Sequence, residues 1–195
     1  MNMALTRESL LTLEAYAKAR PAMRAEVLAV KQARRLFFGE HVVLIFENEL
    51  LIRYQIQEML RIERIFEEAG IRHEMESYAP LVPDGTNLKA TMQIEYADPD
   101  ERAAKLVELK GIEDRVWISV ADFPPVYAIA DEDMERENEQ KTAAVHFLRF
   151  EFTPPMIAAA KAGAALGAGI DHPRYPVRID RLANETRASL AADFA

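Results

Sequence analysis

Apolar and polar residues alternate most regularly in the middle of the chain. After the turn residues Pro83, Asp84 and Gly85, every second residue from Leu88 to Tyr96 is apolar and the residues between them are polar. This period of two indicates a half-buried strand that follows a tight turn. Weaker patterns predict further strands at residues 115–121, 126–130, 142–152 and 177–179.

Helical spacing of apolar residues occurs in the first third of the chain. It predicts helices over residues 21–35 and 53–68, with Pro21 at a first helical position and Gly70 as a C-terminal cap. Between these helices, branched residues at 42–47 and 50–52 flank Asn48 and Glu49, which predicts a tight hairpin.

Three further helices are expected after the central strand. Asp98, followed by Glu101 three residues later, predicts the start of a helix that ends before Gly111. A helix rich in small residues is expected at 155–166, and another helix at the C-terminus. In all, hairpin-prone strands lie between N-terminal and C-terminal helices. This order predicts an α+β fold with a mostly antiparallel sheet flanked by those helices.

Length and composition narrow the protein class. The 195 residues show no repeat or linker, so we expect residues 1–195 to form a single domain. The absence of cysteine excludes disulfides and thiolate-ligated metals or clusters. With 24 basic and 32 acidic residues the net charge is −8, which argues against a dedicated nucleic-acid binder.

No segment predicts export or a membrane span. Arg7 and Glu8 stand where a signal peptide would be apolar. The longest stretches without Asp, Glu, Lys or Arg, residues 152–160 and 162–170, have nine residues each. A membrane-spanning helix needs about 20. We therefore expect a cytoplasmic protein with no membrane partner.

Glu63 is the least expected residue of the second predicted helix. It falls in the middle of the arc formed by Ile52, Ile56, Met59 and Phe66, and Gln55 lies at the edge of this arc. A carboxylate in a core face either finds a cationic partner or has its pKa raised. Glu63 is thus a candidate general acid/base or metal ligand, with Gln55 beside it; the alternative is a core ion pair with an arginine.

His146 is the second candidate catalytic or metal-ligating residue. On the strand predicted at 142–152 it shares an apolar face with Leu148 and Phe150. An imidazole there can ligate a metal or move protons, or it can be a hydrogen-bonded core residue. The chain contains neither Glu-x-x-His nor His-Glu-x-x-His, so a metal signature is weak and no cofactor is predicted.

Two other patterns favour structural explanations. Residues 131–141 hold six acids and two bases, but without the spacing of a calcium loop, so a solvated acidic face is expected. Gly163, Gly167 and Gly169 match the spacing of some dinucleotide-binding loops, but no strand precedes them and no helix follows. Close helix packing followed by a glycine cap explains these glycines better.

The charge is unevenly distributed. Residues 1–40 carry seven bases and four acids, a net charge of +3, which leaves −11 for the remainder. Arg24, Lys31 and Arg35 lie on one stripe of the helix predicted at 21–35. This stripe is a candidate docking face for an acidic partner, or a solvated helix flank.

Four segments together resemble one bacterial family, domain of unknown function 3501. They are RYQIQEMLR at 53–61, DGTNLKAT at 84–91, GIEDRVW at 111–117 and KTAAVHFLRFE at 141–151. The resemblance carries no catalytic residue. What the resemblance implies concerns neighbouring genes: genes of this family tend to lie beside those of rubrerythrin-like and iron–sulfur redox proteins.

Three hypotheses of different classes follow. The first is a non-catalytic accessory protein that docks a partner of a peroxide- or iron-linked redox system. The second is an enzyme or ligand-binding protein with an acid–base or metal site built from Glu63, His146 and Gln55, which requires their elements to pack together. The third is a homodimer joined through an unpaired strand edge or a helix face.

Overall fold

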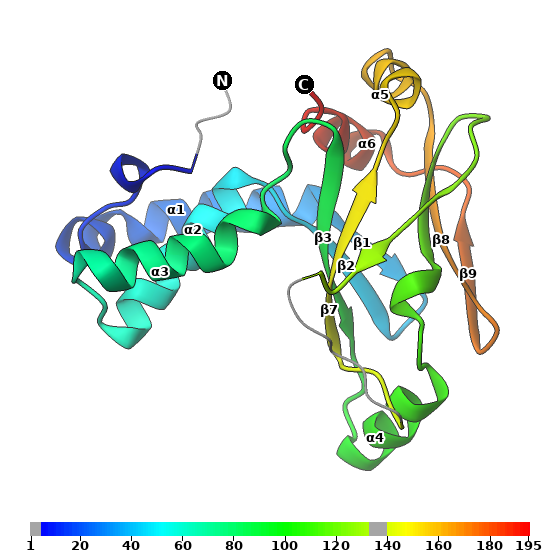
Figure 1. The fold of residues 1–195 in the computed structure, drawn as a ribbon, viewed down its shortest axis with the longest axis horizontal. Helices are drawn as coiled ribbons and strands as arrows, with labels where there is room; N and C mark the ends of the chain where they lie inside the picture. Colours follow the sequence, from blue (N-terminus) through cyan, green and yellow to red (C-terminus); the bar gives the residue numbers. More distant parts are fainter. Residues whose placement is uncertain (1–4, 133–139) are drawn as a thin grey trace. The chain divides into compact units, whose positions relative to one another are not determined.

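The computed structural model describes residues 5–132 and 140–195 (Figure 1). The chain divides into two compact units. The first comprises Met1–Ala33 and Glu47–Pro83, and the second comprises Arg34–Phe46 and Asp84–Ala195. A single domain over residues 1–195 stays a prediction. Among the described residues, no helix has the length and apolar character needed to cross a membrane.

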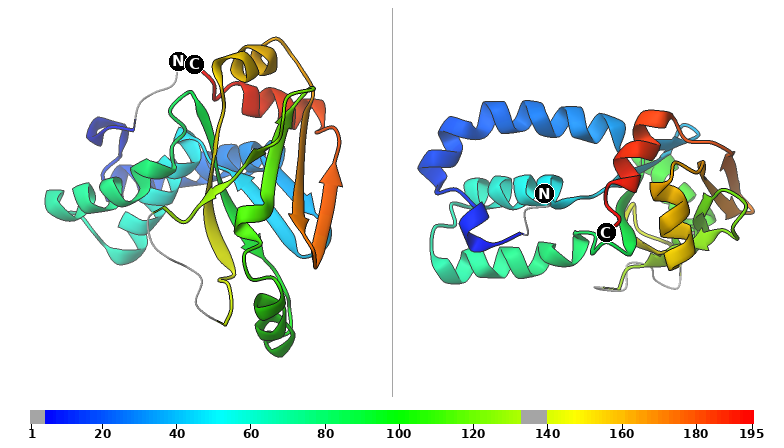
Figure 2. Two further views of the ribbon diagram at one scale, coloured as in Figure 1. Left: turned by 45° about the vertical axis from the view of Figure 1, so that its right-hand side comes forward. Right: turned by 90° about the horizontal axis from the view of Figure 1, so that it is seen from above.

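The first unit is helical. Helix α2 packs against both α1 and α3, and the three lie side by side (Figure 2). Their apolar faces enclose a small core that includes Ile52, Ile56 and Leu60 of α2. The elements are the short 3-10 helix η1 (Arg7–Ser9), α1 (Leu13–Ala33), α2 (Glu49–Glu63), α3 (Glu68–Tyr78) and the 3-10 helix η2 (Ala79–Leu81).

The hairpin predicted around Asn48 is wrong. Asn48 is the N-cap of α2, and its side chain accepts a hydrogen bond from the main-chain N–H of Leu51. Residues 50–52 therefore lie in the first turn of a helix. An Asn side chain that satisfies a free N–H of a first turn stabilises a helix start, and this outweighs the strand propensity of the branched residues around it.

Two other local predictions in this unit also differ from the structure. Pro21 lies inside α1, which begins eight residues earlier at Leu13. Gly70 lies inside α3, and α2 instead ends at Arg64, whose φ of 56° is left-handed. A non-glycine residue can adopt this conformation at a modest energetic cost, so a cap does not require the glycine on which the prediction depended.

The second unit contains two antiparallel sheets, which confirms the α+β class and the antiparallel strand pairing. The first sheet has the order β1-β2-β3-β7-β6 and the second has the order β5-β4-β8-β9. The strands are β1 (Arg35–Phe38), β2 (Val42–Phe46), β3 (Asn87–Ile94), β4 (Val116–Val120), β5 (Val126–Tyr127), β6 (Ile129–Ala130), β7 (Val145–Glu151), β8 (Leu166–His172) and β9 (Tyr175–Ile179).

Helices close the two ends of this unit. Helix α4 (Pro99–Glu108) lies at one end of the sheets, and α5 (Pro154–Lys161) and α6 (Asn184–Ala191) lie at the other (Figure 1). The expected cap of α4 is confirmed, because the Asp98 side chain accepts from the N–H groups of Asp100 and Glu101. A short 3-10 helix, η3 (Glu113–Arg115), leads from α4 into β4.

One core joins the inner faces of the two sheets. The alternation predicted for the central strand is confirmed in β3, where Leu88, Ala90 and Met92 are buried in that core. They meet Ile118 of the second sheet in the same cluster. Met92 pairs with His146 across β3 and β7, so His146 also lies on the inner face of its sheet.

The glycine-rich segment is a strand. Gly167 and Gly169 lie in β8, although Gly163 does follow the end of α5 with a φ of 94°. A Cβ atom at Gly169 would lie 2.4 Å from the indole ring of Trp117. At this position of β8 the Trp117 ring on β4 occupies the space that a side chain would need, so glycine fits there. The expectation that these glycines serve close helix packing is therefore corrected.

Candidate metal centre

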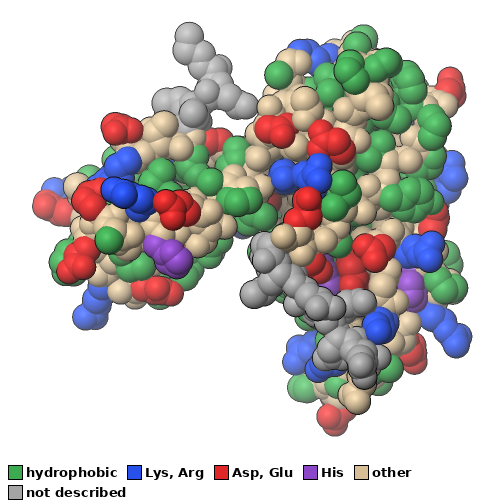
Figure 3. Space-filling model, in the orientation of Figure 1, with side chains coloured by type: hydrophobic (Ala, Val, Ile, Leu, Met, Phe, Trp, Pro, Cys, Tyr) green, Lys and Arg blue, Asp and Glu red, His purple; other side chains and the backbone are tan. Residues whose placement is uncertain are grey.

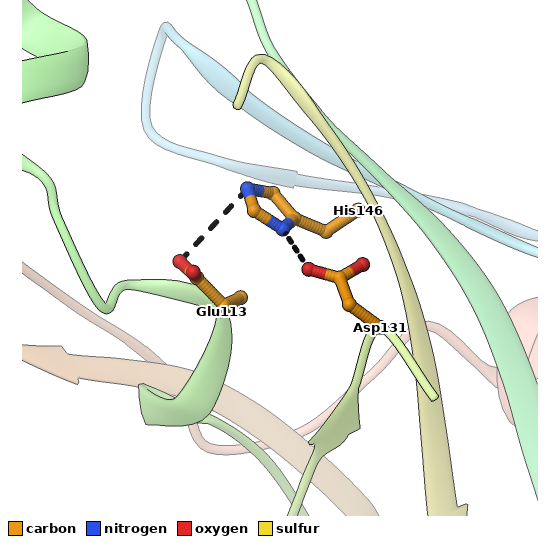
Figure 4. Close-up of side chains that lie close together, drawn as sticks. All are labelled: Glu113, Asp131 and His146. Atoms are coloured by element: carbon orange, nitrogen blue, oxygen red, sulfur yellow. Dashed lines mark hydrogen bonds and ion pairs between the residues drawn. The ribbon is translucent and has the colours of Figure 1, made fainter. Parts of the chain in front are cut away.

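Four side chains from separate elements meet inside the second unit. Glu113 comes from η3, Asp131 follows β6 and His146 lies within β7 (Figure 4). Thr142 precedes β7. The exposed fractions of His146, Thr142 and Glu113 are 0%, 1% and 3%. Ligand atoms of Glu113, Asp131 and His146 all lie within 4.8 Å of one another. We refer to the four residues as the Glu113 cluster.

Asp131 orients the imidazole of His146. Its Oδ2 lies 2.5 Å from Nδ1 of His146, and its Oδ1 accepts a hydrogen bond from the main-chain N–H of Phe147 at 3.1 Å. The N–H of Asp131 donates in turn to the Phe147 carbonyl. This double attachment to β7 holds Asp131 at a left-handed φ of 51°, a conformation that Asp adopts more readily than most residues.

The other ring nitrogen of His146 faces oxygen atoms. Nε2 lies 2.9 Å from Oγ1 of Thr142 and 3.0 Å from the carbonyl oxygen of Ala143. Thr142 donates to the Glu113 carboxylate, with its Oγ1 3.1 and 3.0 Å from the two oxygens. The Oε2 atom of Glu113 is 3.9 Å from Nε2. Nε2 is thus surrounded by a hydroxyl, a carbonyl and a carboxylate oxygen.

This arrangement permits two chemical states. In the first state His146 is hydrogen-bonded, with Nδ1 against the Asp131 carboxylate and Nε2 against the Ala143 carbonyl oxygen, which only accepts. In the second state a metal ion replaces the proton on Nε2, while Asp131 keeps its bond to Nδ1, as carboxylates commonly do behind a metal-bound histidine.

The oxygen spacings around Nε2 resemble a coordination sphere. Metal–ligand bonds of about 2.1 Å place neighbouring octahedral ligands about 3.0 Å apart and opposite ligands about 4.2 Å apart. The contacts of Nε2 with Thr142 and Ala143, and of Thr142 with Glu113, are 2.9–3.1 Å. The separation of Nε2 from Glu113, 3.9 Å, is close to the opposite spacing.

A structure of high similarity has been solved. It is the crystal structure of a novel protein of unknown function from Burkholderia pseudomallei K96243, 57% identical, with a TM-score of 0.94. The match covers 99% of this chain and 100% of that one. A family model described as protein of unknown function (DUF3501) matches residues 4–194. The chain belongs to the DUF3501 family. None of the curated proteins matches it.

Membership of DUF3501 confirms the resemblance found in the sequence but assigns no reaction, so the predicted residues are judged by their positions. The buried position predicted for Glu63 is wrong. Glu63 is exposed, as is Gln55. The apolar face of α2 consists of Ile52, Ile56 and Leu60 instead, and the helix ends at Glu63 before the chain can continue that face.

The predicted pairing of Glu63 with His146 stays a prediction. Glu63 belongs to the first unit of this DUF3501 protein and His146 to the second. The buried position of His146 on an apolar face is confirmed. Its carboxylate neighbours are Asp131 and Glu113, however. The catalytic roles of Glu63, His146 and Gln55 stay predictions.

The predicted docking stripe is wrong as a single helix face. Helix α1 ends at Ala33, so Arg35 lies on β1, where its guanidinium carbon is 5.9 Å from the centre of the Phe37 ring. Arg24 and Lys31 remain on α1, exposed and half-buried respectively. Helical spacing cannot reveal where a helix stops, and here no proline or glycine marks the end.

The acidic run lies partly outside the described residues, which include Asp131 and Glu132 but not 133–139. Glu132 forms an ion pair with Arg149 at 2.7 Å, and Arg149 also contacts Glu151. Acidic and basic side chains thus mix on the outer side of β3 and β7 (Figure 3). The role of Asp131 beside His146 was not expected from the sequence.

Sequence reasoning about this DUF3501 protein missed Glu113, Asp131 and Thr142. Glu113 and Thr142 stand inside two of the segments that carry the family resemblance, GIEDRVW and KTAAVHFLRFE. That signal could have directed attention to them. Asp131 gave no separate signal, because it stands first in a run of acids that looks solvated.

Proposed function

We propose that this protein binds a divalent metal ion at the Glu113 cluster, with His146, Glu113 and Thr142 as ligands and Asp131 as the residue that orients His146. One observation carries the proposal: the donor spacings around Nε2 match the neighbouring and opposite spacings of a coordination sphere. Two carboxylates near the site supply charge that complements a dication.

The ligand types indicate which metals to test. Nitrogen from one imidazole with carboxylate and hydroxyl oxygens suits Mn²⁺, Fe²⁺ or Zn²⁺, and the chain has no thiolate for softer ions. The burial of Glu113, Thr142 and His146 favours a closed site. Catalytic metals keep an open coordination position, whereas structural metals are enclosed. A non-catalytic metal that joins η3 to β7 is therefore the best-supported role.

The test is metal binding by the full chain. Protein purified without a metal-chelating tag is stripped of metal and titrated with Mn²⁺, Fe²⁺ (without oxygen) and Zn²⁺ in a calorimeter. We expect one equivalent of at least one metal to bind to the parent chain and none to the His146→Gln variant. The proposal is contradicted if the parent chain binds none of the three metals, or if the His146→Gln variant binds metal as well as the parent does.

His172 provides a matched control. It is also buried, at 6% exposed, but its ring nitrogens contact the Lys110 carbonyl and the N–H of Arg174 rather than carboxylates. His172→Gln should bind metal like the parent chain. If both variants lose binding together, the loss reflects damage to the second unit and the assignment to His146 fails.

A non-catalytic accessory role for a redox-protein partner is the wider function that we propose for this metal-binding protein. The charge difference between residues 1–40 and the remainder supports an electrostatic partner. A low-salt pull-down with a rubrerythrin-like or iron–sulfur protein tests it. Binding that weakens as salt rises is expected, and absence of binding at low salt would remove this role while leaving the metal proposal intact.

A further inference from the structure

A groove lined by both charged and apolar side chains lies on the second unit, and none of the Glu113 cluster residues lines it. It has a volume of about 690 Å³, within the usual range for small-molecule sites. The turn between β1 and β2 contributes Glu40 and His41, the chain after β3 contributes Glu95 and Tyr96, and α4 contributes Arg102. Apolar side chains, including Ile94, Ala144 and Val145, complete the lining.

His41 is held rigidly in this groove. Its ring stacks on Tyr96 with the ring centres 4.0 Å apart and the planes 15° from parallel. Its main-chain N–H donates to the hydroxyl of Tyr175, which donates in turn to the carbonyl of Phe38. The imidazole is therefore fixed by a stack and by the main chain.

The tautomer of His41 follows from its neighbour. Nδ1 lies 2.9 Å from the carbonyl oxygen of Glu95, which only accepts, so Nδ1 carries a proton. In the neutral ring Nε2 is then an acceptor, and in the charged ring it is a second donor. Among the described residues, Nε2 of His41 has no hydrogen-bond partner.

The groove combines charges of both signs that are not paired with each other. Arg102 is exposed and makes one long hydrogen bond, 3.4 Å, to the Tyr96 carbonyl. Within the described part of the chain, neither Arg102 nor Glu40 nor Glu95 forms an ion pair. The Arg102 guanidinium attracts one carboxylate, whereas the two glutamates repel a second negative group and attract an ammonium group.

We propose that this groove binds a small zwitterion of the amino-acid class, with its carboxylate at Arg102 and its ammonium at Glu40 and Glu95, beside the fixed ring of His41. The apolar lining from Ile94 and Val145 favours an aliphatic side chain on the ligand. The proposal concerns a separate site and does not depend on the metal proposed for the Glu113 cluster.

Three matched probes test the charge pattern: L-leucine, N-acetyl-L-leucine, which lacks the ammonium, and L-leucinamide, which lacks the carboxylate. Binding to the full chain is followed by the NMR signals of the His41 ring. L-Leucine should shift these signals in a saturable way, and each single-charge probe should bind about tenfold or more weakly, because each loses a charge-assisted hydrogen bond.

Variants assign the two ends of the ligand. Arg102→Gln should weaken the binding of L-leucine about tenfold and leave the binding of L-leucinamide unchanged. The Glu40→Gln, Glu95→Gln double variant should weaken the binding of L-leucine and leave the binding of N-acetyl-L-leucine unchanged. Arg174→Gln, at an exposed arginine outside the groove, is the control and should bind like the parent. No shift at His41 up to about 10 mM L-leucine, or equal binding of all three probes, overturns the proposal.

Discussion

Asp131 is joined to β7 by its side chain and its main chain at once, and this fixes its carboxylate against His146. Oδ2 lies 2.5 Å from Nδ1 of His146, while Oδ1 and the N–H of Asp131 both bond to the main chain of Phe147. The orientation of the buried imidazole therefore depends on a residue that lies 15 positions earlier in the chain.

Asp131→Asn should weaken metal binding about 10- to 100-fold, because an amide cannot replace the carboxylate behind a metal-bound imidazole. Asparagine tolerates the left-handed backbone at this position, so the chain should keep its fold. Calorimetric titration with the metal that the parent binds measures the change. Glu132→Gln, which removes the neighbouring exposed acid, should bind as the parent does; a matching loss there would contradict a specific role for Asp131.

Glu58 should stabilise the first unit in a pH-dependent way. Its carboxylate accepts hydrogen bonds from Arg20 and from Tyr16. The hydrogen bond from Arg20 is the main reason that the pKa of Glu58 is lowered to about 2. The ordinary pKa is 4.5. A lowered folded-state pKa gives stability that is complete above about pH 4.5 and declines as the pH falls towards 2.

Glu58→Gln should therefore reduce the free energy of unfolding by about 1–2 kcal/mol at pH 7, and the difference from the parent should shrink between pH 4.5 and 2. Urea unfolding followed by far-UV circular dichroism at several pH values measures this. Glu76→Gln, at an exposed carboxylate of α3, should show no such difference. A Glu58 effect that stays constant down to pH 2 would contradict an origin in the ionised carboxylate and its bond to Arg20.

The buried ion pair of Arg34 and Asp193 should contribute far more to the stability of the second unit than the exposed pair of Arg178 and Asp180. Arg34 is 1% exposed and also donates to the main-chain carbonyls of Phe46 and Ser189. Asp193→Ala leaves this guanidinium without its carboxylate and should destabilise the second unit by about 3–5 kcal/mol.

The single tryptophan, Trp117, lies in the second unit, so its fluorescence during denaturant unfolding measures this effect. Asp180→Ala is the matched control, because the side chains of Arg178 and Asp180 are 72% and 81% exposed. It should leave the unfolding midpoint unchanged. Equal effects of the two substitutions would show that burial does not set the strength of these pairs.

Gly169→Ala should destabilise the second unit by about 1–3 kcal/mol through overpacking. The new Cβ would lie 2.4 Å from the Trp117 ring and 2.7 Å from the carbonyl oxygen of Val177. Gly111→Ala meets no atom within 4 Å but has a φ of 78°, so it should cost only about 1 kcal/mol of backbone strain. The fluorescence emission of Trp117 should shift in the Gly169→Ala variant and not in the Gly111→Ala variant.

Local patterns predicted the elements whose sequence and environment agree. Strand β3 alternates because one face is buried, and the Asp98 cap of α4 is made within four residues. The predictions failed where distant contacts decide. Residues 126–130 form one apolar run, yet β5 pairs with β4 and β6 pairs with β7 in different sheets.

The candidate site shows the same division. The pattern of β7 was sufficient to place His146 on a buried face. Its partners were not predictable, because Glu113 is 33 residues away and Asp131 is 15 residues away in the chain, and periodicity describes only neighbours on one element. Glu63 looked buried for the converse reason: the pattern assumes that the helix continues, and α2 ends at that residue.

The sequence by itself determined the α+β class, the antiparallel strands, the buried face of His146 and the family to which the chain belongs. These follow from short-range periodicity, capping chemistry and shared segments of the chain. Only the tertiary structure decided which carboxylates face His146 and which groups line the groove at His41. Both depend on strand order and on turns that bring distant residues together, and the free energy of those contacts is not encoded in any single local pattern.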